Sequence, residues 1–154
     1  MIRMKKFSLL FLGLVIGFSL LAQSNKQVKW AFSSKKITDN TYEVHMTATI
    51  NGNFHMYAQN VGVEGPLPTA FVFTKNPLLQ LDGKVKETGK LVKKYESTWS
   101  GNVNYYEKTV NFIQTVKVRG TAKTNIAGKV EFMVCDDKLC LPPAEVEFSV
   151  NIGG

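Results

Sequence analysis

The chain has 154 residues, 44% of them hydrophobic, and its 19 Lys and Arg against 12 Asp and Glu give a formal net charge of +7. The basic residues are interspersed with acidic ones and form no block that would mark a nucleic-acid surface, so no nucleic-acid partner is expected. One hydrophobic run near the N-terminus is shorter than the roughly 20 residues that span a bilayer, which argues against a membrane-spanning chain.

Residues 1–22 have the features of a secretory signal peptide. Three basic residues precede an uncharged run from Leu9 to Leu21, and the small residue Ala22 follows at the expected cleavage position. Cleavage there leaves residues 23–154 with a net charge of +4, because the three basic residues of the leader account for the difference from +7. We therefore expect one soluble, exported domain, large enough to bury a hydrophobic core.

Strand patterns dominate the rest of the chain. Apolar and polar residues alternate with a period of two in four segments: 41–50, 108–120, 129–135 and 144–150. This alternation predicts strands with one buried and one solvated face. Weaker strand candidates are residues 30–36, 54–59, 69–73 and 90–95.

Turn-forming pairs separate these segments, and no window of eleven or more residues shows a helical stripe. The pairs are Asp39-Asn40, Asn51-Gly52, Gly65-Pro66, Asp82-Gly83, Gly101-Asn102 and Ala127-Gly128. About eight short strands in one domain predict an all-β fold, an antiparallel β-sandwich of the immunoglobulin-like kind.

Cys135 and Cys140 are the only cysteines, and outside the cytoplasm so close a pair is expected to be oxidised. Cys135 ends the segment 129–135, and the alternation places it opposite Val134, away from the main core. Residues 136–139 would form a hairpin loop that brings the cysteines face to face. Directly opposed residues have Cα atoms about 4.5–5.5 Å apart, within the range that a disulfide accepts.

The residues alone leave three interpretations of this pair open. As a structural bond it would be weak, since closing a ring of six residues contributes only about 2 kcal/mol. A bond that is easily formed and away from the core suits thiol–disulfide exchange with other proteins. If the bond is only structural, the protein would be a non-catalytic binding module with an ordinary hairpin disulfide, and this is the alternative to exchange. A zinc site is disfavoured, because His45 and His55 do not stand at ligand spacing, and exchange itself needs no metal or cofactor.

The neighbours of the pair do not decide which sulfur attacks. Lys138 favours a thiolate, whereas Asp136 and Asp137 oppose it. Pro142 and Pro143 lack backbone donors, so they are predicted to interrupt the sheet beside Cys140 and leave that sulfur open to a partner, or simply to end an edge strand.

Three segments resemble the N-terminal periplasmic domain of DsbD-type thiol:disulfide interchange proteins. The most specific is VEFMVCDDKLCLPPAEVEFSV (130–150), with two cysteines a few residues apart, a Pro-Pro and an acidic residue. NGNFHMYAQN (51–60) and GPLPTAFVF (65–73) are similar to earlier signatures of that domain. The resemblance extends in order over nearly the whole of residues 23–154.

The resemblance implies an immunoglobulin-like sandwich and a redox role for Cys135 and Cys140. It also implies a mobile loop that covers the pair with an aromatic residue. The matching segment here is YESTWSGNVNYY (95–106), in which Trp99 is the expected cap and Tyr95 an accompanying residue. Tyr57 and His55 fall in the matched aromatic–His–x–Tyr run and are expected to line the site.

Such domains pass reducing equivalents from a membrane-embedded thiol donor to periplasmic thioredoxin-like proteins. Complete family proteins also carry a multi-span membrane domain and a thioredoxin-like domain with a Cys-x-x-Cys motif, neither of which the printed chain shows. We therefore expect a periplasmic, monomeric protein-disulfide reductase whose electron donor is a separate protein. A regulatory sensor, in which the loop around Trp99 changes shape with redox state, is a further alternative.

Overall fold

The computed structural model describes residues 26–153, so the expected leader at residues 1–22 lies outside the described residues. The strands are β1 (Val28–Lys36), β2 (Thr41–Ile50), β3 (His55–Tyr57), β4 (Ala70–Phe73), β5 (Leu79–Glu96), β6 (Gly101–Val118), β7 (Thr124–Phe132), β8 (Val134–Cys135) and β9 (Ala144–Ile152). One 3₁₀ turn, η1 (Ser97–Trp99), joins β5 to β6. No helix in this described part is long and apolar enough to cross a membrane.

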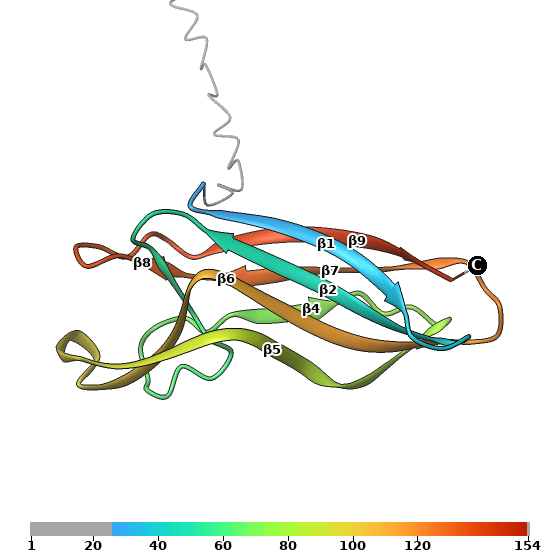
Figure 1. The fold of residues 1–154 in the computed structure, drawn as a ribbon, viewed down its shortest axis with the longest axis horizontal. Helices are drawn as coiled ribbons and strands as arrows, with labels where there is room; N and C mark the ends of the chain where they lie inside the picture. Colours follow the sequence, from blue (N-terminus) through green and yellow to red (C-terminus); the bar gives the residue numbers. More distant parts are fainter. Residues whose placement is uncertain (1–25, 154) are drawn as a thin grey trace, which may run out of the picture.

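The strands form two antiparallel sheets. The larger has the order β1-β2-β6-β3-β8, with β5 paired along the other edge of β6, and the smaller has the order β4-β7-β9. Figure 1 shows the two sheets as layers whose strands run along the length of the molecule. The predicted fold class, an antiparallel immunoglobulin-like β-sandwich, is confirmed.

The main core lies between the two sheets and follows the predicted alternation. On β2 the side chains of Val44, Met46 and Ala48 are fully buried. Trp30 of β1 packs among aromatic rings, with its ring centroid 5.9 Å from that of Phe112 and 5.5 Å from that of Phe132. The second tryptophan of the chain, Trp99, does not pack against this core.

Three glycine-containing pairs predicted to be turns lie instead in strands: Asp82-Gly83 in β5, Gly101-Asn102 at the start of β6 and Ala127-Gly128 in β7. Gly83 (φ +72°) sits in β5, at a shift in its register with β6. Gly128 sits in β7, where a Cβ atom would collide with the carbonyl of Val72, so the missing side chain permits close strand approach. Glycine in a strand marks such irregularities as readily as it marks a turn. β5 and β6 each run for 18 residues.

The segment 129–135 is one strand in the sequence pattern but two in the structure. β7 ends at Phe132 in the smaller sheet, and β8 begins at Val134 in the larger sheet, so the chain changes sheets at Met133. In Figure 1 the hairpin after β8 and the tip between β5 and β6 project at the same end, opposite the C-terminus. The candidate site lies between these two projections.

Candidate functional site

Cys135 and Cys140 are joined by a disulfide and face each other as an antiparallel bridge with Cα atoms 4.0 Å apart. The predicted hairpin is present, and the Cα atoms are closer than the range expected from ordinary strand pairing. Two backbone hydrogen bonds close it, from Asp136 N to Leu139 O and from Leu141 N to Val134 O, both 2.9 Å. The loop is thus ordered by its own backbone as well as by the disulfide.

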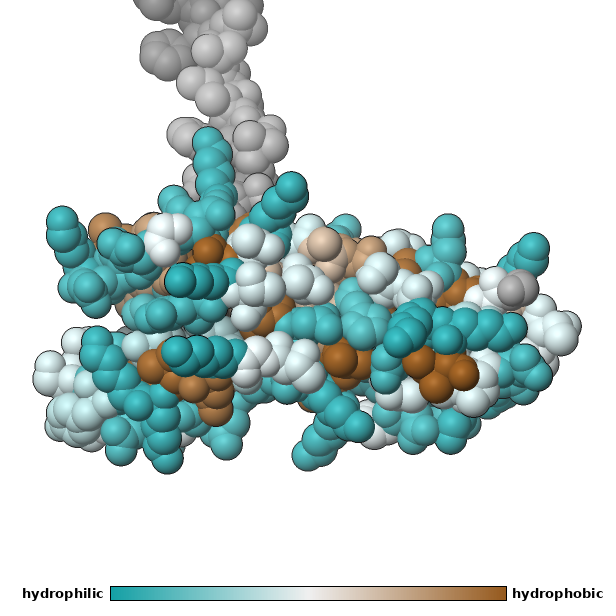
Figure 2. Space-filling view, viewed as in Figure 1, coloured by the Kyte–Doolittle hydropathy of each residue, from teal (hydrophilic) through white to brown (hydrophobic). Residues whose placement is uncertain are grey.

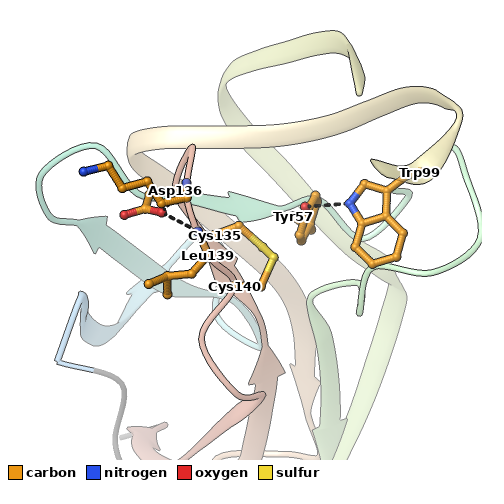
Figure 3. The surroundings of a disulfide bond; sticks show 7 residues. Tyr57, Trp99, Cys135, Asp136, Leu139 and Cys140 are labelled. Carbon is orange, nitrogen blue, oxygen red and sulfur yellow. Dashed lines mark hydrogen bonds between the residues drawn. A yellow bond between two sulfur atoms is a disulfide. The ribbon is translucent and has the colours of Figure 1, made fainter. Parts of the chain in front are cut away.

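Asp136 organises the turn through its side chain. Its Oδ1 accepts hydrogen bonds from the backbone N–H groups of Leu139 and Lys138, each 2.8 Å long. These two bonds, that of Leu139 first, hold the pKa of the Asp136 carboxyl below its usual value. The carboxylate is engaged with the loop backbone, as Figure 3 shows for Leu139.

The two cysteines differ sharply in exposure. Cys135 is 3% exposed, whereas Cys140 is an exposed residue. The prediction that Cys135 lies off the main core is correct, but the residue is not open to solvent. It belongs to a second hydrophobic cluster, which we call the site cluster: Tyr57, Val61, Val103, Tyr105, Met133 and Cys135.

Strand alternation explains the site cluster. On β3, Met56 faces the main core and Tyr57 the site cluster, and on β6 the same division separates Tyr106 from Tyr105. This end of the larger sheet therefore buries apolar side chains on both faces. Sequence reasoning missed Val103 and Tyr105, which it placed in a loop, although their period-two spacing was the signal that could have identified them.

Trp99 covers one side of the site cluster and is half-buried. Its Nε1 donates a hydrogen bond of 3.3 Å to Oη of Tyr57, which is fully buried. Burial is the main cause that raises the pKa of Tyr57 above its usual value. The predicted covering loop 95–106 is much shorter in the structure, because only residues 97–100 form the tip and the rest belongs to β5 and β6.

The loop between β3 and β4 holds Trp99 in place from the other side. Gly65 has φ +123°, and a Cβ atom there would collide with the six-membered part of the Trp99 ring. A Cβ atom at Gly101 would likewise collide with the side chain of Val63. The tip and this loop are thus in close contact, and two glycines make the contact possible.

A cleft of about 420 Å³ separates the tip from the cysteine hairpin. Its lining residues are Tyr57, Lys94, Tyr95, Glu96, Ser97, Thr98, Trp99, Cys135, Asp136, Asp137, Lys138, Leu139 and Cys140. The cleft brings together all the residues proposed from the sequence except three: Pro142 and Pro143, which lead from the hairpin into β9, and His55. Figure 3 shows Tyr57 with the disulfide on one side and Trp99 on the other.

His55 lies beside the disulfide without lining the cleft. It is 7% exposed, and its ring centroid is 4.3 Å from that of Tyr105 and 5.4 Å from that of Tyr57. Burial lowers the pKa of His55, and the negative charges of Glu96 and Glu107 partly oppose this. Between residues 26 and 153 no three His, Cys, Asp or Glu side chains are grouped so as to hold a metal ion.

The entrance of the cleft carries two exposed apolar side chains. Tyr95 on β5 is 63% exposed and Leu139 at the turn of the hairpin is 51% exposed. On the face drawn in Figure 2, hydrophobic side chains form small separate groups among hydrophilic ones. Sequence reasoning did not single out Leu139, since one leucine in a charged loop gives no pattern.

Comparison with known proteins gives one family and several related folds. The family model described as "Thiol:disulfide interchange protein DsbD, N-terminal" matches residues 22–152. No curated protein matches the chain. The N-terminal domain of Neisseria meningitidis DsbD in the reduced form is 17% identical, with a TM-score of 0.52 over 81% of this chain and 86% of that one.

Two further solved structures share the fold. The N-terminal periplasmic domain of ScsB from Proteus mirabilis is 14% identical, with a TM-score of 0.54 over 84% of this chain and 47% of that one. The complex between the DsbD and PilB N-terminal domains from Neisseria meningitidis contains a chain that is 14% identical, with a TM-score of 0.53 over 80% of this chain and 82% of that one. At such identities these structures establish the fold.

Proposed function

This chain belongs to the family of DsbD N-terminal domains, and on that premise we propose that it is a thiol:disulfide interchange protein of the periplasm. It passes reducing equivalents from a membrane-embedded thiol donor to thioredoxin-like proteins through Cys135 and Cys140. The sulfur atoms carry the two electrons, so the reaction needs no cofactor.

The unequal exposure of the two cysteines is the observation that supports this function most. A partner entering the cleft meets Cys140, which is exposed, while Cys135 is buried in the site cluster. The donor thiolate attacks Sγ of Cys140, the bond between the two cysteines breaks, and its electron pair remains on Sγ of Cys135. A second donor thiolate then releases Cys140, which leaves the donor oxidised and this protein reduced.

The reverse sequence reduces an acceptor. The Cys140 thiolate attacks the acceptor disulfide and forms a mixed disulfide, which Cys135 resolves by attacking Sγ of Cys140. The acceptor departs with two thiols, and the bond between Cys135 and Cys140 forms again. The two cysteines thus have separate roles, Cys140 in contact with partners and Cys135 in resolution.

Tyr95 and Leu139 form the contact rim for such a partner. They stand on opposite sides of the cleft entrance and expose apolar surface next to the disulfide. Tyrosine is enriched at protein–protein interfaces, so the exposed Tyr95 beside the disulfide suits a surface that binds other proteins. The solved DsbD–PilB complex supports the proposal in one respect: a domain of this fold associates with another protein domain.

The main competing function is a binding module whose disulfide is only structural. The hairpin is already closed by two backbone hydrogen bonds and by the side chain of Asp136. A further cross-link over six residues contributes about 2 kcal/mol, less than a longer loop would give. A bond that contributes so little to the fold is better suited to repeated opening.

The equilibrium reduction potential of the disulfide tests the proposal. Residues 23–154 are titrated against a thiol redox buffer, and the fraction of reduced protein is measured by alkylation. A value between about −180 and −270 mV, where exchange proteins lie, is expected. A value below about −300 mV is typical of structural disulfides and would overturn the proposed function.

A further inference from the structure

Four chemically active side chains lie in one row across the larger sheet. Cys140 pairs with Cys135, Cys135 with His55 and His55 with Glu107, each in antiparallel register. Directly paired residues project from the same face of a sheet, with Cβ atoms about 4.5–5.5 Å apart. His55 is thus the immediate neighbour of the buried cysteine, on the side away from Cys140.

The imidazole of His55 has an unused nitrogen. Nε2 is buried and finds no hydrogen-bond partner among the residues that the structure describes. Such a group calls for an explanation, because leaving it unsatisfied costs about 1–3 kcal/mol. In the disulfide form Sγ of Cys135 carries no proton, whereas reduction places an S–H donor in the same row.

We propose that His55 is the proton-transfer partner of Cys135, a role that rests on the exchange function proposed above. During resolution the Cys135 thiol gives its proton to Nε2 of neutral His55, and the resulting thiolate attacks Sγ of Cys140. The mixed disulfide breaks, and the partner leaves as a thiolate. In the opposite direction, protonated His55 returns the proton to Cys135 as the disulfide opens.

The surroundings of His55 suit a group that must exchange a proton. Its ring is enclosed by Tyr57 and Tyr105, and burial favours the neutral base near pH 7. The charged groups that act on it come from three elements: Lys94 and Glu96 of β5, Glu107 of β6, and Asp136 and Asp137 of the hairpin. Carboxylates outnumber the lysine, so they offset part of the cost that burial places on an imidazolium formed during the reaction.

Stepwise release of a coloured thiol isolates the step in question. Reduced protein (residues 23–154) is mixed with dithiobis(nitrobenzoate), so that attack by Cys140 releases the first nitrothiobenzoate and resolution by Cys135 the second. In His55→Gln the second release is expected to slow about 100-fold or more near pH 7, since a positioned general base contributes at least about that factor. The deficit closes above about pH 9, where a thiol ionises unaided.

His45→Gln is the matched control, because the chain has only two histidines and His45 lies on β2, paired with Ile113. This variant should release both thiols at the wild-type rates. A His55→Gln variant that resolves at the wild-type rate, or that is slowed equally at every pH, would overturn the proton-transfer role. The latter result would mean that the ring is needed only for packing.

A measurement on the unmodified protein covers the case in which His55→Gln does not fold. The ¹⁵N resonance of His55 Nε2, distinguished from that of His45 by the control variant, is expected to move on reduction as it accepts a hydrogen bond. An unchanged Nε2 resonance would contradict the proposal. Neither experiment uses the physiological partner. A reduction potential in the range of structural disulfides, together with the expected effects at His55, would therefore reject the exchange function and leave proton transfer between Cys135 and His55 supported.

Discussion

Trp99 Nε1 donates a hydrogen bond to Tyr57 Oη over 3.3 Å, which ties the tip between β5 and β6 to the site cluster that buries Cys135. Tyr57 is fully buried, whereas Trp99 is half-buried and borders the cleft. The position of the tip at the edge of the cleft therefore depends on one side-chain hydrogen bond together with packing. We propose that the tip is the cover that limits access to the sulfurs.

Tyr57→Phe tests this hydrogen bond while keeping the buried ring. A net contribution of about 0.5–1.5 kcal/mol corresponds to a two- to tenfold change in the population of the closed tip. The disulfide should accordingly be reduced two- to tenfold faster by dithiothreitol, and Trp99 fluorescence, measured with Trp30 replaced by Phe, should shift to longer wavelength. Tyr42→Phe, a buried tyrosine of the main core, is the control, and equal reduction rates for both variants would contradict the prediction.

Gly65→Ala approaches the same contact from the opposite side. A Cβ atom at this position would collide with the Trp99 ring, and the φ of +123° is itself unfavourable for alanine. We expect displacement of the indole, faster reduction of the disulfide by small thiols and a lower melting temperature. Gly52→Ala separates the two causes, because Gly52 also has positive φ but open space around it. Only Gly65→Ala should change the reduction rate.

Single-cysteine variants test the division of roles between the two sulfurs. Cys135→Ala leaves the exposed Cys140 without its resolving partner, so mixed disulfides with a thioredoxin-like protein or with glutathione should accumulate. Cys140→Ala leaves only the buried Cys135, which should form at least tenfold less adduct in the same time. Non-reducing electrophoresis and intact mass measure both. Equal trapping by the two variants would show that burial of Cys135 does not restrict attack.

The strand pattern was enough to predict the fold class, and local residues were enough to predict the hairpin. Period-two alternation on β2 and β6 marked the inward faces, because burial on one side of a strand imposes that spacing. Gln114 shows the limit of this reasoning. It occupies an inward position and is 1% exposed, yet it donates to the carbonyls of Thr115 and Asp82.

The site was harder to predict because its parts meet only in three dimensions. Tyr57 and Cys135 are 78 residues apart in the chain, and their contact depends on the change of sheet at Met133. The alternation of apolar and polar residues predicted that Cys135 faces away from the main core, but it could not show that a second cluster buries this residue. The pairing of His55 with Cys135 likewise depends on the register of β3 and β8, which the sequence does not encode locally.

The stability of the oxidised protein should fall as the pH drops below about 7, and His55 should cause part of the fall. Burial lowers the pKa of His55 in the folded chain, while the unfolded chain retains a value near 6.5. Below that value the unfolded state binds more protons than the native state, so the free energy of unfolding decreases with falling pH until the folded pKa is passed. Each unit of difference between the two pKa values corresponds to about 1.4 kcal/mol.

Urea denaturation of the oxidised protein measures this dependence. It is carried out between about pH 7.5 and 5, the range in which histidine titrates. His55→Phe keeps an aromatic ring against Tyr105 and removes the titrating group, so its unfolding free energy should vary less over this interval. Asp136 acts in a separate, more acidic range, because its lowered pKa contributes stability that is lost only when the pH falls through that value. If the pH dependence persists unchanged in His55→Phe, other groups cause the loss of stability in acid. Burial of His55 would then disfavour its charged form only slightly.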